Sequence, residues 1–530
     1  MKIEEYDDKK EIVTVVLEKP PPQHELLYNP ITYVQAFKEL LVTGATISGS
    51  LIILQLDEFL SVYLLKNLNS DALEAILLIQ REKGIAIGLL SAPVGVLSVL
   101  VSAAIKGQKP NEEIAAIFQA GLLTGVVFSL PYILFAALNK YILVACGQDP
   151  VIAEEVQDFF WGYLPSITPF FLQYAAAQFF LGAQKRILTV AIDAGGTALS
   201  LGLTYIFSYG LGALPRQGMR GYGFAKTVAT LLCVAGYGLL LQFYPYFRSY
   251  RLFSCQWQLK EKIIVILKLG LPVMVAVFGE IGLQFASVLM AGALGREYLI
   301  AQSIVAAYNS LMVISILGFF RATSILVSGA VAQTRFNDVN RYILSGTVLT
   351  SLAPLIFLAG SLLIPRTLAN VFLNSADEVN PVITNMLKLN LPLSAGNDLL
   401  DGIRLVLMGA LLGKQDVIIP TIGNLITQLF IMLPLMYVLA FHTQLELAGL
   451  QIGNMIGIVL MSTLMCFKLF MPNINCCRKK DYKDYDENTL LKSTTISNSI
   501  SHTLFAQKRI DTSAEIDKPV YGTFQDTNTI

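Results

Sequence analysis

The chain has 530 residues, of which 54% are hydrophobic and only 14% are charged, and its mean hydropathy is +0.59. A soluble protein has about a quarter of its residues charged, so this composition indicates a chain that folds in lipid. The 38 basic and 38 acidic residues cancel, which excludes the strong positive charge of a nucleic-acid-binding protein. We therefore expect a polytopic integral membrane protein that has no nucleic acid among its partners.

Histidine and cysteine exclude further classes of protein. The three histidines, His24, His442 and His502, are too scattered to form a haem, zinc or copper site. The six cysteines form neither a CxxC pair nor an extracellular cluster, so no disulfide framework is predicted. The sequence also contains no nucleophile elbow and no Walker A pattern. We expect no metal site, no cofactor and no enzymatic activity.

Apolar runs dominate the chain between its two ends. A helix that crosses a bilayer needs about 20 predominantly apolar residues. Twelve runs meet this requirement, near residues 36–60, 72–104, 114–143, 155–182, 188–210, 221–246, 264–293, 298–330, 341–364, 382–412, 416–440 and 446–471. The sequence therefore predicts an all-α membrane protein of twelve spans, with both termini on the same side.

The two ends differ from the apolar core. Residues 1–34 are acidic, contain three consecutive prolines and lack the apolar region of a signal peptide, so the first run is expected to remain as a span. Residues 473–530 are polar and have no sustained helical period, which predicts disorder. The expected organisation is a tail at 1–34, an N-terminal lobe at 35–246, a linker at 247–263, a C-terminal lobe at 264–472 and a tail at 473–530.

The positive-inside rule gives the orientation of the chain. Alternate loops differ in their basic residues: one set carries Lys106, Lys109, Lys185, Arg186, Arg248, Arg251, Lys260, Lys262, Arg335 and Lys414, and the other carries Lys66, Lys140, Arg216, Arg220, Arg296 and Arg366. The more basic set is expected in the cytoplasm. Both tails are then cytoplasmic, and the plasma membrane, or the inner membrane of a bacterial cell, is the expected location.

Two loops recur in the second half of the chain. Residues 107–113 resemble 333–338, and residues 182–186 resemble 413–416, at offsets near 225 and 231. This recurrence predicts two six-helix repeats. Two lobes around a central cavity are the arrangement that alternating access requires.

Several of these stretches carry a resemblance to a known family. The tenth run contains LLDGIRLVLMGALLG at 399–413, and the other matching features are Gly270-Leu271-Pro272 with Glu280, Asp57, Asp149-Pro150 and Pro434. The chain resembles the MATE (multidrug and toxic compound extrusion) family of secondary transporters, and is closer to its NorM-like branch, over residues 35–472. The resemblance implies two pseudo-symmetric six-helix bundles that form a V, and export of an organic solute in exchange for H⁺ or Na⁺.

The resemblance also implies residues that bind the coupling cation. Glu280 and Asp401 match the acidic positions of NorM-like members, and Asp57 matches the acidic position of the first helix. The other branch of the family has an Asn and an Asp four residues apart in its fifth helix, where this chain has Ser200 and Thr204. The resemblance therefore does not imply an N-lobe proton switch of that type.

Polar residues inside the runs support these assignments independently. A charge at the bilayer centre costs about 2.5–3.5 kcal/mol on insertion scales, so a charged residue within a span indicates function. Glu280 has apolar or small neighbours, and desolvation favours the protonated form of a lone carboxylate, which would let it carry a proton. The residues expected to line a substrate cavity, because they form polar stripes at helical spacing, are Gln284, Ser287, Asn397, Arg404, Asn424, Gln428, Ser200 and Thr204.

Several charged positions leave alternatives open. Arg404 lies one turn after Asp401 and either pairs with it structurally, fixes its negative charge, or binds an anionic substrate. Arg81–Glu82 or Lys83–Asp57 pairing is as compatible with the sequence as a substrate role.

Asp193 either contacts substrate or ion, or is a solvated residue near a helix end. Arg81, Lys83, Arg321 and Arg404 also suit the alternative function, a flippase for lipids or lipid-linked oligosaccharides. In either case the expected partners are a small-molecule substrate and membrane lipids, and we expect a monomer.

Overall fold

The computed structural model describes residues 30–66, 68, 71–210, 215–254, 259–363 and 381–470. The elements in these ranges are helices, with no strand among them, which confirms the predicted all-α membrane fold. Met1–Cys466 belong to one compact unit, and of the second unit, Phe467–Ile530, only the last turn of a helix is described. The predictions for residues 1–29 and for the tail at 473–530 lie outside the described residues.

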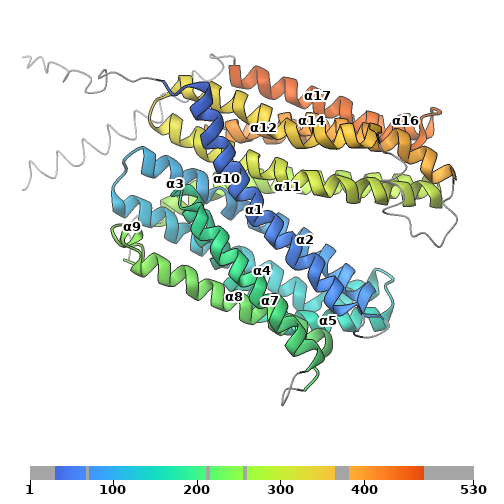
Figure 1. Ribbon diagram of the computed structural model, residues 1–530, viewed down its shortest axis with the longest axis horizontal. Coiled ribbons are helices and arrows are strands. Elements are labelled where there is room, and N and C mark those ends of the chain that lie inside the picture. Colours follow the sequence, from blue (N-terminus) through green and yellow to red (C-terminus); the bar gives the residue numbers. More distant parts are fainter. Residues whose placement is uncertain are drawn as a thin grey trace, which may run out of the picture. The chain divides into compact units, whose positions relative to one another are not determined.

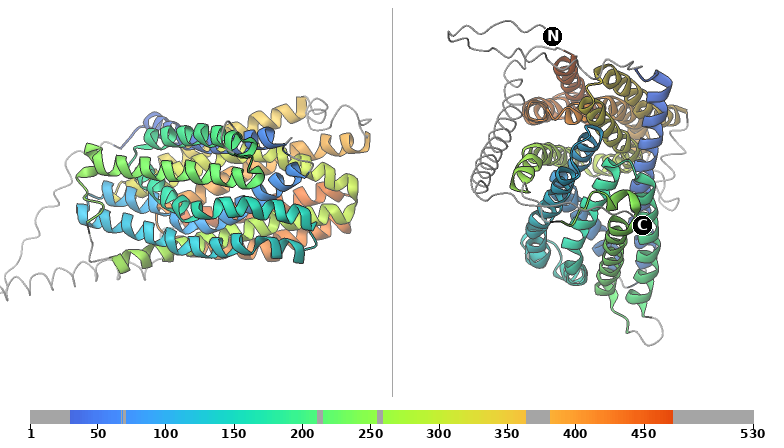
Figure 2. Two further views of the ribbon diagram at one scale, coloured as in Figure 1. Left: turned by 90° about the horizontal axis from the view of Figure 1, so that it is seen from below. Right: turned by 90° about the vertical axis from the view of Figure 1, so that its left-hand side faces the viewer.

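The described helices are shown in chain order in Figures 1 and 2. Their bounds are α1 Tyr33–Leu65, α2 Ala72–Gly95, α3 Leu97–Lys106, α4 Asn111–Ala145, α5 Pro150–Tyr163, η1 Leu164–Ser166, α6 Ile167–Gly182, α7 Arg186–Tyr209, α8 Gly218–Phe243, α9 Pro245–Arg248, α10 Leu259–Leu294, α11 Arg296–Ala332, α12 Phe336–Leu363, α14 Pro381–Gly413, α15 Ile418–Ile426, η2 Thr427–Met432, α16 Leu433–Phe441 and α17 Glu446–Phe470. We call α1 to α8 the N-half, and α10 to α17 the C-half.

Most of the predicted spans are found among these helices. Ten segments within the described ranges are long and apolar enough to cross a membrane. The other two predicted runs fall on α5–α6, which the 3₁₀ turn η1 interrupts, and on α14, which carries Asp398, Asp401 and Arg404. The chain is thus a multi-pass membrane protein, and the twelve-span count is consistent with its helices.

Prolines divide three of the predicted runs, which are therefore not single regular helices. The run at 72–104 breaks between α2 and α3, shortly after Pro93, and the run at 155–182 breaks at η1, which contains Pro165. The run at 416–440 widens into the π-helical segment η2 just before Pro434. Proline has no N–H to donate, and its ring clashes with the carbonyl four residues earlier, which favours an interruption near these points.

The two halves repeat the same contacts. Ser102 on α3 donates to the carbonyl oxygen of Ile325 at 2.8 Å, and Ser328 on α11 donates to that of Val99 at 3.1 Å. Ser328 is 226 residues after Ser102, and Ile325 is 226 residues after Val99. This reciprocal pair of hydrogen bonds confirms the predicted pseudo-symmetry and joins the halves to each other.

Two glycines close equivalent contacts within the halves. A Cβ on Gly182 would lie 2.6 Å from the carbonyl oxygen of Ser98, and a Cβ on Gly413 would lie 2.8 Å from that of Ser324. Ser324 is 226 residues after Ser98. In both halves a side chain at the glycine would push apart two helices that pack backbone to backbone.

We expect Gly182→Ala and Gly413→Ala each to lower the free energy of unfolding by about 1–3 kcal/mol, because the added methyl group overlaps a neighbouring carbonyl. Thermal melting of the purified protein in detergent measures the effect. Gly202→Ala is the matched control, since a Cβ there has nothing within 4 Å. Equal melting temperatures for all three variants would contradict the proposed packing.

Candidate functional site

Arg404 on α14 joins two acidic side chains. Its Nε donates to Asp401 Oδ1 at 2.6 Å, and its Nη2 donates to Glu280 Oε1 of α10 at 2.9 Å. The expectation that Arg404 pairs with Asp401 is met. The expectation of a lone Glu280 is wrong, because the guanidinium reaches Glu280 from a helix that is distant in sequence.

Asn424 on α15 completes this group, which we call the Arg404 cluster: Arg404, Asp401, Glu280 and Asn424. Its Oδ1 accepts a hydrogen bond from Arg404 Nη1 at 3.2 Å. The side chain of Arg404 is only 7% exposed, whereas those of Glu280 and Asp401 are 32% and 28% exposed. With both carboxylates ionised, the cluster carries one net negative charge, and its accessible groups are the carboxylates.

The π-helical segment η2 brings a further polar side chain close to the cluster. Gln428 lies in η2 and its side-chain oxygen contacts α10 so closely at Gly279 that a Cβ there would overlap it. Gly279 directly precedes Glu280. A π-helical turn in a membrane helix is common at functional sites, and here it results from the proline that follows.

Two other predicted cavity residues belong to a separate network of side-chain amides. Asn397 on α14 donates to Gln451 Oε1 of α17 at 2.9 Å, and Gln451 donates to Gln302 Oε1 of α11 at 3.3 Å. Gln302 in turn donates to Ser287 Oγ of α10 at 3.2 Å. Gln284, expected on the same face as Glu280 and Ser287, is exposed. The polar residues that were predicted to line one cavity therefore do not all lie at the same site.

Asp398 is a buried carboxylate that our sequence analysis did not single out. It is 8% exposed, and no lysine, arginine or histidine among the described residues lies within ion-pair distance of it. The Asn309 amide, in the orientation that satisfies its neighbours, donates to Asp398 Oδ2 at 3.3 Å. Asp398 lies four residues after Ser394, and this helical spacing was the feature of the sequence that could have assigned Asp398 to the polar stripe of α14.

The N-half contains two acid–base pairs that link α1 to other helices. Lys226 on α8 donates to Asp57 Oδ2, and Lys83 on α2 donates to Glu58 Oε1. The Lys83–Asp57 pairing, which the sequence left open beside a substrate role, is therefore wrong: Lys83 pairs with Glu58, the residue that follows Asp57. Glu58 and Lys226 were missed, although each is a charged residue inside a predicted span.

The other charged candidates have polar neighbours of their own. Glu82 accepts a hydrogen bond from Asn139 of α4 at 2.9 Å, rather than from Arg81, which is exposed. Arg321 on α11 donates to the hydroxyl of Tyr174 at 3.3 Å. These contacts give no reason to assign Arg81 or Arg321 to a binding site.

Ser200, Thr204 and Asp193 lie on the face of α7 that meets α1. Ser200 and Thr204 are 4% and 0% exposed, and their hydroxyl groups have no hydrogen-bond partner. Asp193 is 8% exposed and accepts from Ser50 Oγ at 2.8 Å, so its description as a solvated end residue is wrong. The candidate residues thus divide between the C-half and the N-half.

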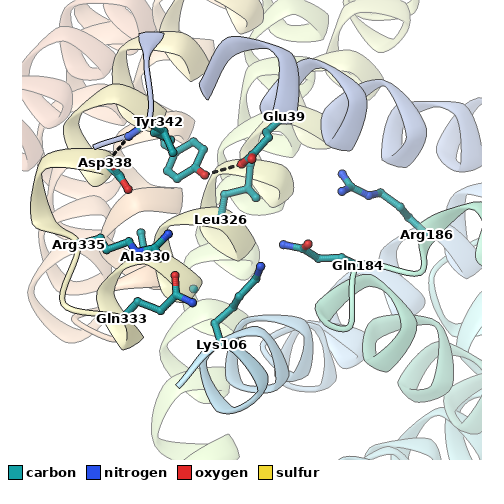
Figure 3. Close-up of a pocket in the computed structure, with 12 residues that line it drawn as sticks. Glu39, Lys106, Gln184, Arg186, Leu326, Ala330, Gln333, Arg335, Asp338 and Tyr342 are labelled. Carbon is teal, nitrogen blue, oxygen red and sulfur yellow. Dashed lines mark hydrogen bonds between the residues drawn. The ribbon is translucent and has the colours of Figure 1, made fainter. Parts of the chain in front are cut away.

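A polar cavity of about 290 Å³ lies elsewhere, lined by the first turns of α1, α7 and α12 and by the last turns of α3 and α11 (Figure 3). Tyr342 donates to Glu39 Oε2 at 2.5 Å beside it. Its lining side chains come from both halves and include Lys106, Gln184, Arg186, Arg335 and Asp338. Three of these, Lys106, Arg186 and Arg335, belong to the loops predicted to be cytoplasmic. In the described part of the chain, no group of three or more His, Cys, Asp or Glu residues could hold a metal ion.

The comparisons with known proteins agree with this architecture. The MatE family model matches residues 47–206 and 272–438. A probable multidrug resistance protein NorM from Brucella suis is 26% identical over 390 residues, which are 72% of this chain and 81% of that protein. A probable NorM from Rhodopseudomonas palustris is 27% identical over 72% of this chain and 80% of that protein.

Solved structures share the fold at low sequence identity. A mutant of the Vibrio cholerae MATE transporter VcmN has a TM-score of 0.73 at 13% identity, covering 82% of this chain and 97% of that one. A MOP superfamily transporter from Pyrococcus furiosus has a TM-score of 0.71 at 15% identity, covering 83% and 99%.

We expect Arg404→Gln to lower the free energy of unfolding by about 1–3 kcal/mol, because two carboxylates lose their shared partner and both are partly screened by exposure. Melting in detergent measures the loss. The double variant Arg404→Gln with Glu280→Gln should recover part of it, since one unpaired charge is then absent. Arg220→Gln, at an exposed position of α8, is the control. No recovery in the double variant would argue against the shared pairing.

Proposed function

The chain belongs to the MATE family of membrane transporters, and we propose that it is a secondary active efflux transporter that exports amphipathic organic solutes in antiport with H⁺ or Na⁺. The observation that carries this proposal is the charge of the Arg404 cluster. Two carboxylates share one guanidinium, so one negative charge remains for a cation.

Competition for that charge explains why two cations would be exchanged. A proton, a sodium ion or the cationic group of a solute each neutralises the cluster, but two of them together would leave an excess positive charge in a poorly solvated site. Binding of one therefore disfavours binding of the other. Coupled to alternating access between the two halves, this exclusion produces antiport.

The proposed roles follow the contacts. Glu280 and Asp401 are the coupling carboxylates, Arg404 sets the charge of the site, and Asn424 orients the guanidinium. Gln428 lies close to this group, and we assign it to the substrate cavity. Asp57 is the corresponding coupling candidate of the N-half, where Lys226 already compensates its charge.

We also propose the membrane location, the orientation and the oligomeric state of the protein. We place the protein in the plasma membrane, or the bacterial inner membrane, as a monomer with both termini in the cytoplasm. The support is the excess of lysine and arginine in alternate loops, of which Lys106, Arg186 and Arg335 gather around one cavity.

The alternative is a flippase, for which basic side chains would have to hold an anionic head group. The Pyrococcus transporter is described as having a binding pocket of reverse polarity that suggests a different function. In this chain Lys83, Lys226 and Arg404 are each paired with a carboxylate. A phosphate would have to displace those carboxylates, which favours the cation exporter.

We expect Glu280→Gln to abolish gradient-driven export, because the cluster then has no net charge to exchange. Proteoliposomes with an imposed pH or Na⁺ gradient and a cationic dye measure export. The matched control is Glu154→Gln, which removes an exposed carboxylate paired with Lys140 at 3.1 Å. Export at the wild-type rate by a correctly inserted Glu280→Gln protein would exclude Glu280 as a coupling group.

Arg404→Gln should shift substrate preference toward cations. Without the guanidinium the cluster gains a second net negative charge, and a change of this kind should favour cationic over zwitterionic solutes by about tenfold, the equivalent of roughly 1.4 kcal/mol. Transport of a panel of cationic, zwitterionic and anionic solutes measures the preference, with Arg220→Gln as control. An unchanged panel would leave Arg404 with a structural role alone.

A further inference from the structure

The polar cavity of Figure 3 is shared by the two halves and has no lining residue in common with the Arg404 cluster. The N-half supplies α1, the end of α3 and the start of α7, and the C-half supplies the end of α11 and the start of α12. We call it the helix-end cavity. One water molecule needs about 10–15 Å³ of such space, so a volume of about 290 Å³ holds a small polyatomic ion together with water.

Lys106 reaches the helix-end cavity across the contact between the halves. It is the last residue of α3, and its stem lies on α11 at Gly329, where an added Cβ would come within 3.1 Å of the Lys106 Cγ. Because Gly329 has no side chain, the lysine can extend from the N-half onto the C-half. Figure 3 shows its amino group pointing into the cavity.

The groups that point into the cavity lack protein acceptors. The Lys106 side chain is half-buried, and its ammonium has no hydrogen-bond or ion-pair partner among the described residues. The side-chain amides of Gln184 and Gln333 also point into the cavity in Figure 3, and neither has a partner in the described part of the chain. A cation and two amides therefore face one common space.

The acidic side chains of the lining already accept hydrogen bonds from the protein. Asp338 is 1% exposed, and its Oδ1 accepts from the backbone N–H of Ile31 at 3.2 Å. The Oε2 of Glu39 accepts from the hydroxyl of Tyr342 at 2.5 Å. Neither carboxylate is within ion-pair distance of Lys106, so the lysine lacks a counter-ion from the lining.

Positive charge predominates in the helix-end cavity. Its charged lining residues are three basic and two acidic: Lys106, Arg186, Arg335, Glu39 and Asp338. With all five ionised the lining carries one net positive charge. Lysine and arginine side chains are hydrogen-bond donors without acceptor capacity, so the surplus charge comes with surplus donors.

The repeated fold does not require these basic residues. The offset of 226 relates Lys106 of α3 to Ala332 of α11, and the offset of 231 relates Arg186 of α7 to Val417 before α15. The equivalent helix ends of the C-half are thus built with uncharged residues. The positive-inside rule accounts for basic residues anywhere in these loops, but not for an ammonium turned into a cavity between the halves.

We propose that the helix-end cavity binds a phosphate group, of inorganic phosphate or of a phospholipid head group, and that the bound anion joins the N-half to the C-half. A phosphate group combines negative charge with several acceptor oxygens, which suit ammonium, guanidinium and amide donors arranged around it. Lys106 approaches from the N-half and Arg335 from the C-half. The site is separate from the carboxylates to which we assign antiport.

The first test titrates inorganic phosphate into the purified full-length protein in a non-ionic detergent. Calorimetry measures the affinity, and the melting temperature is recorded against sodium chloride at equal ionic strength. We expect phosphate to bind and to raise the melting temperature, because a ligand of the folded state stabilises it. Lys106→Gln and Arg335→Gln should each weaken binding about tenfold, as for loss of one charge-assisted hydrogen bond.

Matched variants separate the cavity from the general charge of the loops. Lys109→Gln removes an equal charge three residues after Lys106, from an exposed side chain 3.8 Å from Glu113. Lys260→Gln does the same at an exposed position of the C-half. Both should bind phosphate as the wild type does. Gln333→Ala, which should also weaken binding, keeps the C-half contribution testable if the Arg335 variant does not fold.

A second titration identifies the source of the phosphate group. Phosphatidic acid is added in mixed micelles, with phosphatidylcholine, which has no net charge, as the reference. Binding of phosphatidic acid alone would assign the site to a lipid head group, and binding of inorganic phosphate would assign it to a soluble anion.

The proposal is overturned if neither compound binds, or if the Lys106→Gln protein binds as tightly as the wild type. Equal losses in Lys106→Gln and Lys109→Gln would reduce the effect to loop charge and also overturn it. Weaker binding in the variants of one half only would refute the link between the halves. These measurements involve no transport, so their failure is distinct from failure of the proposed export.

Discussion

Compensation of charge inside the membrane is the constraint on which the interior of this protein depends. Lys83, Lys226 and Arg404 are buried, and each is paired with a carboxylate on another helix. Arg404 is also paired with Asp401, one turn away on its own helix. An uncompensated charge at this depth would cost several kcal/mol, so each pair fixes the rotation of the helices that carry it. The Arg404 cluster ties α10, α14 and α15 together, and the lysine pairs tie α1 to α2 and α8.

The two halves have similar backbones but carry different charged residues at equivalent positions. The offset of 231 that relates Gly182 to Gly413 also relates Asp193 of α7 to Asn424 of α15. In the C-half this position is an amide that accepts a hydrogen bond from Arg404. In the N-half it is a carboxylate that accepts hydrogen bonds from Ser50 and Tyr237. Equivalent helices therefore offer a paired site in one half and an unpaired carboxylate in the other.

Hydropathy was sufficient to predict the all-α membrane fold, and local spacing was sufficient to predict the contact between Asp401 and Arg404. Asp401 and Arg404 are one turn apart, and the sequence alone placed them together. It could not pair Glu280 with Arg404 or Asp57 with Lys226, which are 124 and 169 residues apart, because such contacts depend on how each helix is rotated against its neighbours. The alternative of a Lys83–Asp57 pair was wrong for the same reason.

Polar stripes were similarly ambiguous. The stripe on α14 divides among the Arg404 cluster, the amide network of Asn397 and the buried Asp398, because one broad face meets several helices. The prolines themselves could be read from the sequence, but the sequence did not show which of them would interrupt a helix.

The position of Glu280 connects the proposed exchange to the contact between the halves. Arg404 holds both Glu280 of α10 and Asp401 of α14, so a cation bound at Glu280 would leave the guanidinium to Asp401 alone and weaken the link between these helices. Helix α10 also packs on α2 of the N-half, where a Cβ on Gly270 would lie 2.5 Å from the Cα of Pro93. Because contacts this close cannot deform gradually, release of α10 at the cluster would act on the contact between the halves, where alternating access requires movement.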